Sequence, residues 1–132
     1  MTQMKIDAAD VKWQWQEETG VPGTYALIGT HKASPSPVCI VWWRFAFKAK
    51  AIEIVDSFVR EQSRRIGVRT AANDFMFANF DADKVTEIVT QGGTDSGAKW
   101  MKAVGYQRAK DGHWYVTRRQ WEARARKVGR RL

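Results

Sequence analysis

The residues between two predicted elements of the chain could bind an anion. Arg64 and Arg65 precede Gly67, and Arg69 follows it, between a β-like stretch at residues 51–59 and a helical pattern at residues 67–80. A loop at the start of a helix presents N–H groups without intrahelical partners and the positive end of the helix dipole. Because Gly67 has no Cβ, it would let the backbone approach a ligand. The arrangement predicts a site for a pyrophosphate group.

The β-like stretch also carries two carboxylates, Glu53 and Asp56. Side chains alternate between the two faces of a strand, so an odd spacing predicts that these two residues lie on opposite faces. A pair of cooperating carboxylates, as in a glycosidase, is therefore not expected here.

Other chemistries have less support in the sequence. Cys39 is the single cysteine, so it is expected to be a buried structural residue, and no internal disulfide can form. His31 and His113 lack the spacing of a metal site, and no metal is expected. The glycine-rich residues 92–97 lack the lysine of a nucleotide-binding loop, and capping of a helix explains them better.

Positive charge is concentrated at the carboxyl end. The formal net charge of the chain is +8, and residues 117–132 contribute six of these charges. This segment predicts binding to a nucleic acid or an acidic partner, and a solvated terminal helix is the alternative. Its basic residues are Arg118, Arg119, Arg124, Arg126, Lys127, Arg130 and Arg131.

The elements that would position these residues follow an α+β, mixed α/β order. A short helix is expected from Asp7 or Asp10, with Val11, Trp13 and Trp15 on one side, and residues 20–23 end it. Residues 25–30 and 38–47 predict a hairpin, residues 51–59 a third strand, residues 67–80 a helix and residues 84–90 a strand. A helix capped by Thr94 or Asp95 then ends at Gly105.

The end of the chain has two further signals. Asp111-Gly112 is a two-residue hairpin turn between residues 106–110 and 113–117. Thr117 and Gln120 have the spacing of a capping box, which predicts a final helix. The length of 132 residues predicts one domain over residues 1–116, followed by a basic helix over residues 117–132.

Targeting signals are not expected. The longest apolar run, residues 38–43, is far shorter than the ~20 residues of a membrane-spanning helix. The first residues include acids and lack the long apolar stretch of a signal peptide. A cytoplasmic protein without a membrane anchor is expected.

Two segments in this order resemble the GCN5-related N-acetyltransferases. Residues 52–59 followed by residues 64–69 (RRIGVR) look like the fourth strand and acyl-CoA loop of that family. Residues 97–106 (GAKWMKAVGY) look like the A-x-x-F/L-Y-x-K-x-G-F segment on the next helix. The resemblance covers about residues 25–116.

The resemblance implies a central, mostly antiparallel sheet of about six strands flanked by helices, and an acyl-CoA such as acetyl-CoA as the acyl donor. It implies that Glu53 is the base that deprotonates an amine acceptor, and that N–H groups near Val59 stabilise an oxyanion if a bulge lies there. The residues implied for the cofactor are Phe58, Val59, Arg64, Arg65, Ile66, Gly67, Val68 and Arg69.

The sequence departs from the family pattern at two positions. Arg69 replaces a second small residue, so its side chain must turn outward or contact the phosphates. Met101 stands where many members have a tyrosine that protonates the departing thiolate, and Tyr106 or Tyr115 could substitute. The segment before Tyr25 is also short, which predicts an open acceptor site.

An N-acyltransferase and a binding protein that has kept the fold but lost catalysis are therefore the two alternatives. An atypical member that modifies nucleic acid would combine their features. The amine acceptor is not identified by the sequence, and a homodimer is a further alternative.

Overall fold

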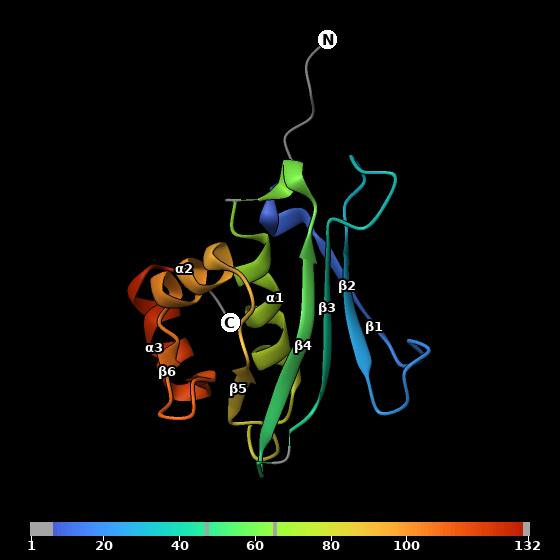
Figure 1. The fold of residues 1–132 in the computed structure, drawn as a ribbon. Helices are drawn as coiled ribbons and strands as arrows, with labels where there is room; N and C mark the ends of the chain where they lie inside the picture. Colours follow the sequence, from blue (N-terminus) through green and yellow to red (C-terminus); the bar gives the residue numbers. More distant parts are fainter. Residues whose placement is uncertain (1–6, 47, 65, 131–132) are drawn as a thin grey trace.

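The computed structural model describes residues 7–46, 48–64 and 66–130, so that Phe47, Arg65 and Arg131 lie outside the described residues. Within the described residues, a mixed sheet of seven strands has the order β1-β2-β3-β4-β5-β7-β6, and all neighbours are antiparallel except the parallel pair β4 and β5. This confirms the expected mixed α/β class with a mostly antiparallel sheet. Figure 1 shows β1 to β4 side by side. The strands are β1 (Lys12–Gln16), β2 (Tyr25–Thr30), β3 (Cys39–Phe45), β4 (Ala51–Val59), β5 (Glu87–Thr90), β6 (Gln107–Arg108) and β7 (Trp114–Thr117).

The prediction of a helix in the first twenty residues is wrong. A single 3₁₀ turn, η1 (Ala8–Asp10), leads directly into β1, which pairs with β2. Val11, Trp13 and Trp15 are two residues apart, and the two tryptophans contact Phe75 on the helix side of the sheet. The alternation of these residues with polar ones is the strand period, and pairing with β2 stabilises it.

The hairpin of β2 and β3 is confirmed, and so is the third expected strand as β4. The register of β3 against β4 shifts between Trp42, opposite Asp56, and Trp43, opposite Ile54. This leaves Val55 without a direct partner, which is the geometry of a β-bulge. The bulge lies at Val55 and not near Val59, which pairs with Cys39 in regular register.

The bulge changes which side chains share a face. Glu53 lies opposite Arg44 and Asp56 lies opposite Trp42, and these two β3 residues are two positions apart on one face. Glu53 and Asp56 therefore lie on the same face of the sheet. The expectation of opposite faces is wrong because strict alternation does not hold across an inserted residue.

The α-helices of the described residues are α1, α2 and α3, and they lie together on one face of the sheet (Figure 1). In α2 the Thr94 side chain accepts from Gly97 N, and in α3 Thr117 and Gln120 form the expected capping box. Both caps satisfy N–H groups that a helix cannot satisfy itself. The helices are α1 (Val68–Asn79), α2 (Asp95–Val104) and α3 (Arg118–Lys127).

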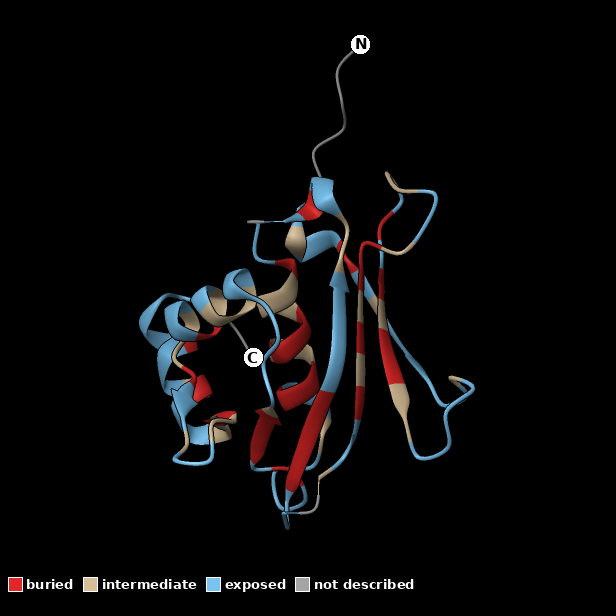
Figure 2. Ribbon diagram, in the orientation of Figure 1, coloured by how far each residue is buried: buried red, intermediate tan, exposed pale blue. Residues whose placement is uncertain are grey.

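The core lies between these helices and the sheet. Ile52, Ile88 and Val116 from three neighbouring strands pack in one buried cluster with Met76 of α1 and Trp121 of α3. Figure 2 shows that β4 is buried along its first half and exposed along its second. None of the described helices packs on the opposite face, which carries Glu53, because residues 17–24 join β1 to β2 without a helix.

Within the described residues, none of the helices combines the length and the apolar character needed to cross a membrane.

Candidate functional site

The parallel strands β4 and β5 diverge partway along their length. They pair from Ala51 opposite Glu87 to Ile54 opposite Thr90, and β5 ends there. The chain then turns at Gly92, which has a φ of 75°, while β4 continues through residues 55–59. The second half of β4 thus has a β3 partner on one edge and no β5 partner on the other.

The first turn of α1 follows the diverging end of β4. Gly67 is the N-cap, in the left-handed conformation with a φ of 86°, and no side chain caps the helix. Ala71 N, bonded to Gly67 O at 2.9 Å, is the first intrahelical donor. The N–H groups of Val68, Arg69 and Thr70 lack such partners, and the dipole adds positive potential to them.

Space is available at this turn. A Cβ at Gly67 would have no heavy atom within 4 Å, whereas its φ disfavours any residue with a Cβ. Arg64 contributes an exposed guanidinium, whose Nε donates to Val59 O at 3.1 Å. The helix start can therefore hold an anion by backbone amides with one arginine beside it.

The guanidinium of Arg69 points away from the proposed anion position. Its Nη1 donates to Asn73 Oδ1 at 2.5 Å, and its guanidinium lies 4.8 Å from the ring centroid of Trp100. Because Arg69 turns toward α2, only its backbone N–H remains at the start of α1. Arg65 of the expected phosphate loop is outside the described residues.

Apolar side chains surround the diverging edge. Val55, Phe58 and Ile66 are 48%, 43% and 41% exposed, respectively, which is high for residues of this type. Val59 is partly buried, and the Val68 side chain is fully buried, so that Val68 offers its amide alone. These exposed groups could contact an extended apolar ligand along β4.

Glu53 lies next to the point of divergence, on the face without helices. Residue 53 is buried, and Arg44 Nη2 lies 3.2 Å from Glu53 Oε1 while Arg44 Nε donates to the same oxygen at 3.2 Å. Sequence analysis missed Arg44, although the register of the β3–β4 pair, if known, would have identified it. Asp56 shares the face but accepts the N–H of Ser57 at 2.8 Å.

The residues considered as proton donors to the departing thiolate lie in two different places, in the core and on the face of the sheet that carries Glu53. Met101 is buried in the core, and Tyr106 is buried with its hydroxyl accepting from Asn73 Nδ2 at 2.7 Å. Burial raises the pKa of the Tyr106 hydroxyl, and the nearby Arg69 charge lowers it only in part. Tyr115 pairs with Val89 and is partly buried on the face of Glu53. Of the two tyrosines, only Tyr115 lies on that face.

The basic residues of the carboxyl segment fall into two groups. Arg118, 12% exposed in its side chain, donates to Phe77 O, to Phe80 O at 3.0 Å and to Val85 O at 3.0 Å. Arg124 donates to Ala103 O at 2.5 Å, and Arg130 pairs with Asp74 at 3.0 Å. These three arginines cross-link α3 and the following residues to α1, α2 and the segment before β5.

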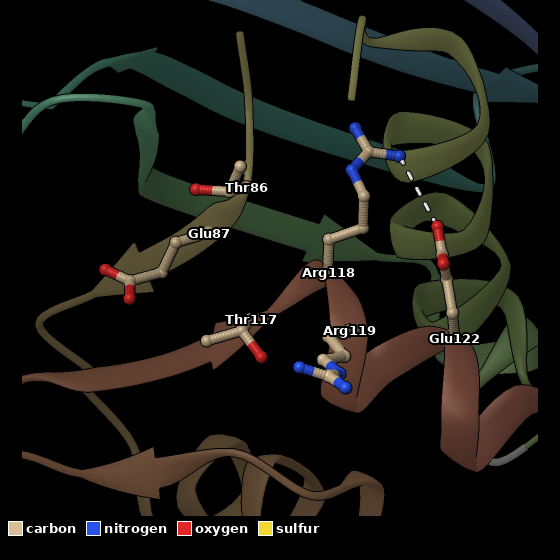
Figure 3. Close-up of a pocket in the computed structure, with 6 residues that line it drawn as sticks. All are labelled: Thr86, Glu87, Thr117, Arg118, Arg119 and Glu122. Atoms are coloured by element: carbon tan, nitrogen blue, oxygen red, sulfur yellow. Dashed lines mark ion pairs between the residues drawn. The ribbon is translucent and has the colours of Figure 1, made fainter. Parts of the chain in front are cut away.

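The second group is exposed and consists of Arg119, Arg126 and Lys127. Figure 3 shows Arg119 beside Arg118, which forms an ion pair with Glu122 at 3.7 Å, around a cavity of about 310 Å³. Glu87 lines this cavity and lies opposite the first residue of β4. The cavity is therefore at the opposite end of the β4–β5 pair from the start of α1.

No protein-family model matches the sequence, and no curated protein gives a significant match. Solved structures do match. An acetyltransferase from Thermus thermophilus has a TM-score of 0.59 at 17% identity, over 73% of this chain and 65% of that one, so this chain spans just under two thirds of its length. YhhK from E. coli, described as an N-acetyl transferase and solved bound to coenzyme A, has a TM-score of 0.59 at 18% identity, over 74% and 73%.

A third match is the KacTA complex with DNA, with a TM-score of 0.62 at 8% identity over 78% of this chain and 73% of that one. Two structures described as acetyltransferases of the GCN5-related N-acetyltransferase (GNAT) family, from Staphylococcus aureus and Desulfovibrio desulfuricans, also match, each with a TM-score of 0.60. Because the identities are low, these matches concern the fold. The chain has the fold of the GCN5-related N-acetyltransferases, as its sequence motifs predicted.

Proposed function

We propose that the protein is an acyl-CoA-dependent N-acyltransferase that uses acetyl-CoA. The observation that carries the proposal is the uncapped start of α1, with Gly67 in the left-handed conformation, directly after the β4 edge that β5 leaves unpaired. A diphosphate suits such a helix start. An extended amide-containing chain suits an unpaired strand edge, since it can take up the free backbone hydrogen bonds.

The residues around this edge have complementary roles in the proposal. The amides of Gly67, Val68 and Arg69 and the Arg64 guanidinium would hold the diphosphate. Phe58, Val59 and Ile66 would contact the less polar part of the donor. Acetyl-CoA supplies an activated thioester, and the backbone N–H groups at the Val55 bulge would stabilise a developing oxyanion.

Glu53 is proposed to accept the proton of the amine nucleophile. Lysine-like amines have a pKa near ~10.4, so a positioned carboxylate assists attack at neutral pH, directly or through one water. Glu53 lies on the face without helices, so the acceptor would approach from the side opposite α1. The amine would attack the thioester directly in a ternary complex.

A tyrosine acid is not essential to this scheme. A free thiol has a pKa near ~8.5, so the CoA sulfur can leave as a thiolate near neutral pH. The buried Met101 is therefore compatible with transfer. Tyr115, on the same face as Glu53, would be the residue available to donate a proton.

Isothermal titration calorimetry with acetyl-CoA tests the proposal. The unmodified protein should bind, and Gly67→Glu should weaken binding at least tenfold because it introduces a carboxylate at the anion position. Gly23→Glu is the matched control, since Gly23 also has positive φ and open space around it. No heat of binding by the unmodified protein at millimolar acetyl-CoA would contradict the proposal.

A second candidate function is nucleic-acid binding through Arg119, Arg126 and Lys127. It is supported by their exposure and by the fold match to a protein in a DNA complex. The variant with all three changed to Gln should elute from immobilised DNA at lower salt. The control changes Lys99, Lys102 and Lys110 to Gln, which removes the same charge elsewhere on the surface. Equal elution of the two variants would contradict a specific role of α3.

A further inference from the structure

A second cavity, of about 440 Å³, lies at the other end of α1 from Gly67. It opens between the carboxyl end of that helix, at Asn79, and the neighbouring ends of β1, β2 and β3. A helix of 12 residues is about 18 Å long, so this cavity is well separated from the start of α1. Its aromatic lining consists of Trp15, Tyr25, Trp43, Phe45 and Phe80.

Trp43 is the centre of this aromatic group. Its ring is stacked on Tyr25 with a centroid distance of 4.8 Å, and it meets the ring of Phe80 edge-on at 5.0 Å. Phe45 and Trp15 contact it edge-on at 5.5 Å and 5.7 Å. The rings therefore present both faces and edges in several directions around the cavity.

The outer members of the group are not buried by the fold. Phe45 is 63% exposed and Trp15 is 37% exposed, whereas Trp43 is buried. The indole Nε1 of Trp43 has no hydrogen-bond partner among the described residues. Two exposed aromatic rings at one cavity indicate that a ligand with apolar groups would fit it, and the Trp43 indole N–H could bond only an acceptor elsewhere on such a ligand.

The charge of the residues that line the cavity determines whether an anionic or a cationic ligand would bind there. Glu17 lines it, and none of the described lining residues is basic, although the whole chain has a net charge of +8. A phosphate or a carboxylate alone would meet a like charge there. A cation with apolar substituents would meet the negative faces of the rings and the Glu17 carboxylate.

We infer that this cavity is a binding site for an organic ammonium group with alkyl substituents, such as a quaternary ammonium. Small metal cations are strongly hydrated and need oxygen ligands, which one carboxylate does not supply. A quaternary ammonium has no N–H to satisfy and contacts aromatic faces directly. The group could belong to a free small molecule or to a methylated lysine side chain, and both have the same chemistry.

Titration of ¹⁵N-labelled protein with choline tests the inference, with the indole N–H signals of Trp15 and Trp43 as the readout. Choline should shift both signals, and its neutral isostere 3,3-dimethylbutan-1-ol should bind at least tenfold more weakly. Equal affinity of the two compounds, or no shift with choline at 50 mM, overturns the inference. A peptide with trimethyllysine, compared with the same peptide with lysine, distinguishes the two sources of the group.

Two pairs of variants locate the site. Glu17→Gln should weaken choline binding about fivefold or more, and Glu18→Gln, next to it but outside the lining, should not. Phe45→Ala should reduce affinity similarly, and its control is Val128→Ala, which truncates a 56% exposed apolar residue at the end of α3, outside the lining. Both lining residues are exposed, so the variants should fold. Unchanged affinity in Glu17→Gln and Phe45→Ala also overturns the inference.

Discussion

Arg44 and Glu53 form an ion pair across β3 and β4, with Arg44 Nη2 3.2 Å from Glu53 Oε1. The pair lies on the face of the sheet that no described helix covers, and Glu53 is one residue before the last β4 residue that pairs with β5. Arg44 is about half exposed, so its guanidinium can move aside without unfolding the strand. The carboxylate is thus held at the position where β4 and β5 separate, and because its side chain is only 11% exposed, an acceptor would reach it once Arg44 moves.

Glu53→Gln keeps the size of this side chain and removes its ability to accept a proton. With spermidine, poly-L-lysine and a lysine peptide as acceptors, we expect CoA thiol release to fall about 10²-fold or more in kcat for the best acceptor. The affinity for acetyl-CoA should stay within about twofold. A steady-state assay of thiol release measures the first effect, and calorimetric titration with acetyl-CoA measures the second.

Asp56→Asn is the control for this substitution. Asp56 lies on the same face, but its carboxylate accepts the N–H of Ser57, beyond the bulge. The kcat of the Asp56→Asn variant should stay within about threefold of the value for the unmodified protein. An Asp56→Asn loss as large as that of Glu53→Gln would argue against a specific role of Glu53.

Arg118 should contribute to stability. Its guanidinium donates to carbonyl groups at the end of α1 and before β5, and the ring of Phe77 lies 5.2 Å from it. Hydrogen bonds to charged groups contribute about 1.5–3 kcal/mol, and Arg118→Ala leaves buried carbonyls unpaired. We expect a loss of about 2–3 kcal/mol in the free energy of unfolding, measured by urea denaturation.

The neighbouring Arg119 is the matched control, because it is exposed and carries the same charge. Arg119→Ala should change the free energy of unfolding by no more than about 0.5 kcal/mol. If Arg118→Ala and Arg119→Ala lower the free energy of unfolding by the same amount, the hydrogen bonds of Arg118 to the carbonyl groups do not contribute to stability.

Cys39 should make stability fall at alkaline pH. Burial raises the pKa of its thiol from 9.0 to about 11, and Arg69 offsets this only in part. The unfolded chain therefore loses the thiol proton first, and stability falls between about pH 9 and pH 11. Two pKa units correspond to about 2–3 kcal/mol at most. Urea denaturation across this range measures the effect, and Cys39→Ala should show a shallower decline.

The same burial predicts slow chemical modification. The folded protein should not react with a thiol reagent such as DTNB within minutes at pH 8, and it should react with one equivalent after denaturation in guanidinium. Fast modification of the folded protein would show that Cys39 is accessible.

Local signals in the sequence predicted many of the elements. The capping box of Thr117 and Gln120 and the Thr94 cap each concern residues within four positions, so their hydrogen bonds depend little on the rest of the chain. Asp111-Gly112 correctly predicted the antiparallel β6–β7 hairpin, but the two-residue turn is wrong: Ala109 N donates to His113 O at 2.8 Å, which leaves a three-residue loop at 110–112. The first strand was missed although its tryptophans alternate with polar residues, because five residues give only a short periodic pattern and the pairing with β2 is not visible in its own sequence.

The candidate site could be predicted only in part. The position of Gly67 before α1 follows from local sequence, because glycine readily adopts the left-handed conformation found at this helix start. The bulge at Val55 depends on how β3 packs beside β4, and it brings Glu53 and Asp56 to one face. The direction of Arg69 depends on Asn73 and on Trp100 of α2, a contact between distant parts of the sequence.

The central claim is that the start of α1 binds the diphosphate of an acyl-CoA. Titration of ¹⁵N-labelled protein with coenzyme A tests it most directly through the backbone amide signals. The largest shifts should occur at residues 67–70 and at residues 55–59 of β4, and Gly67→Glu should abolish them. Shifts confined to α3, or no shifts at 5 mM coenzyme A, would contradict the claim.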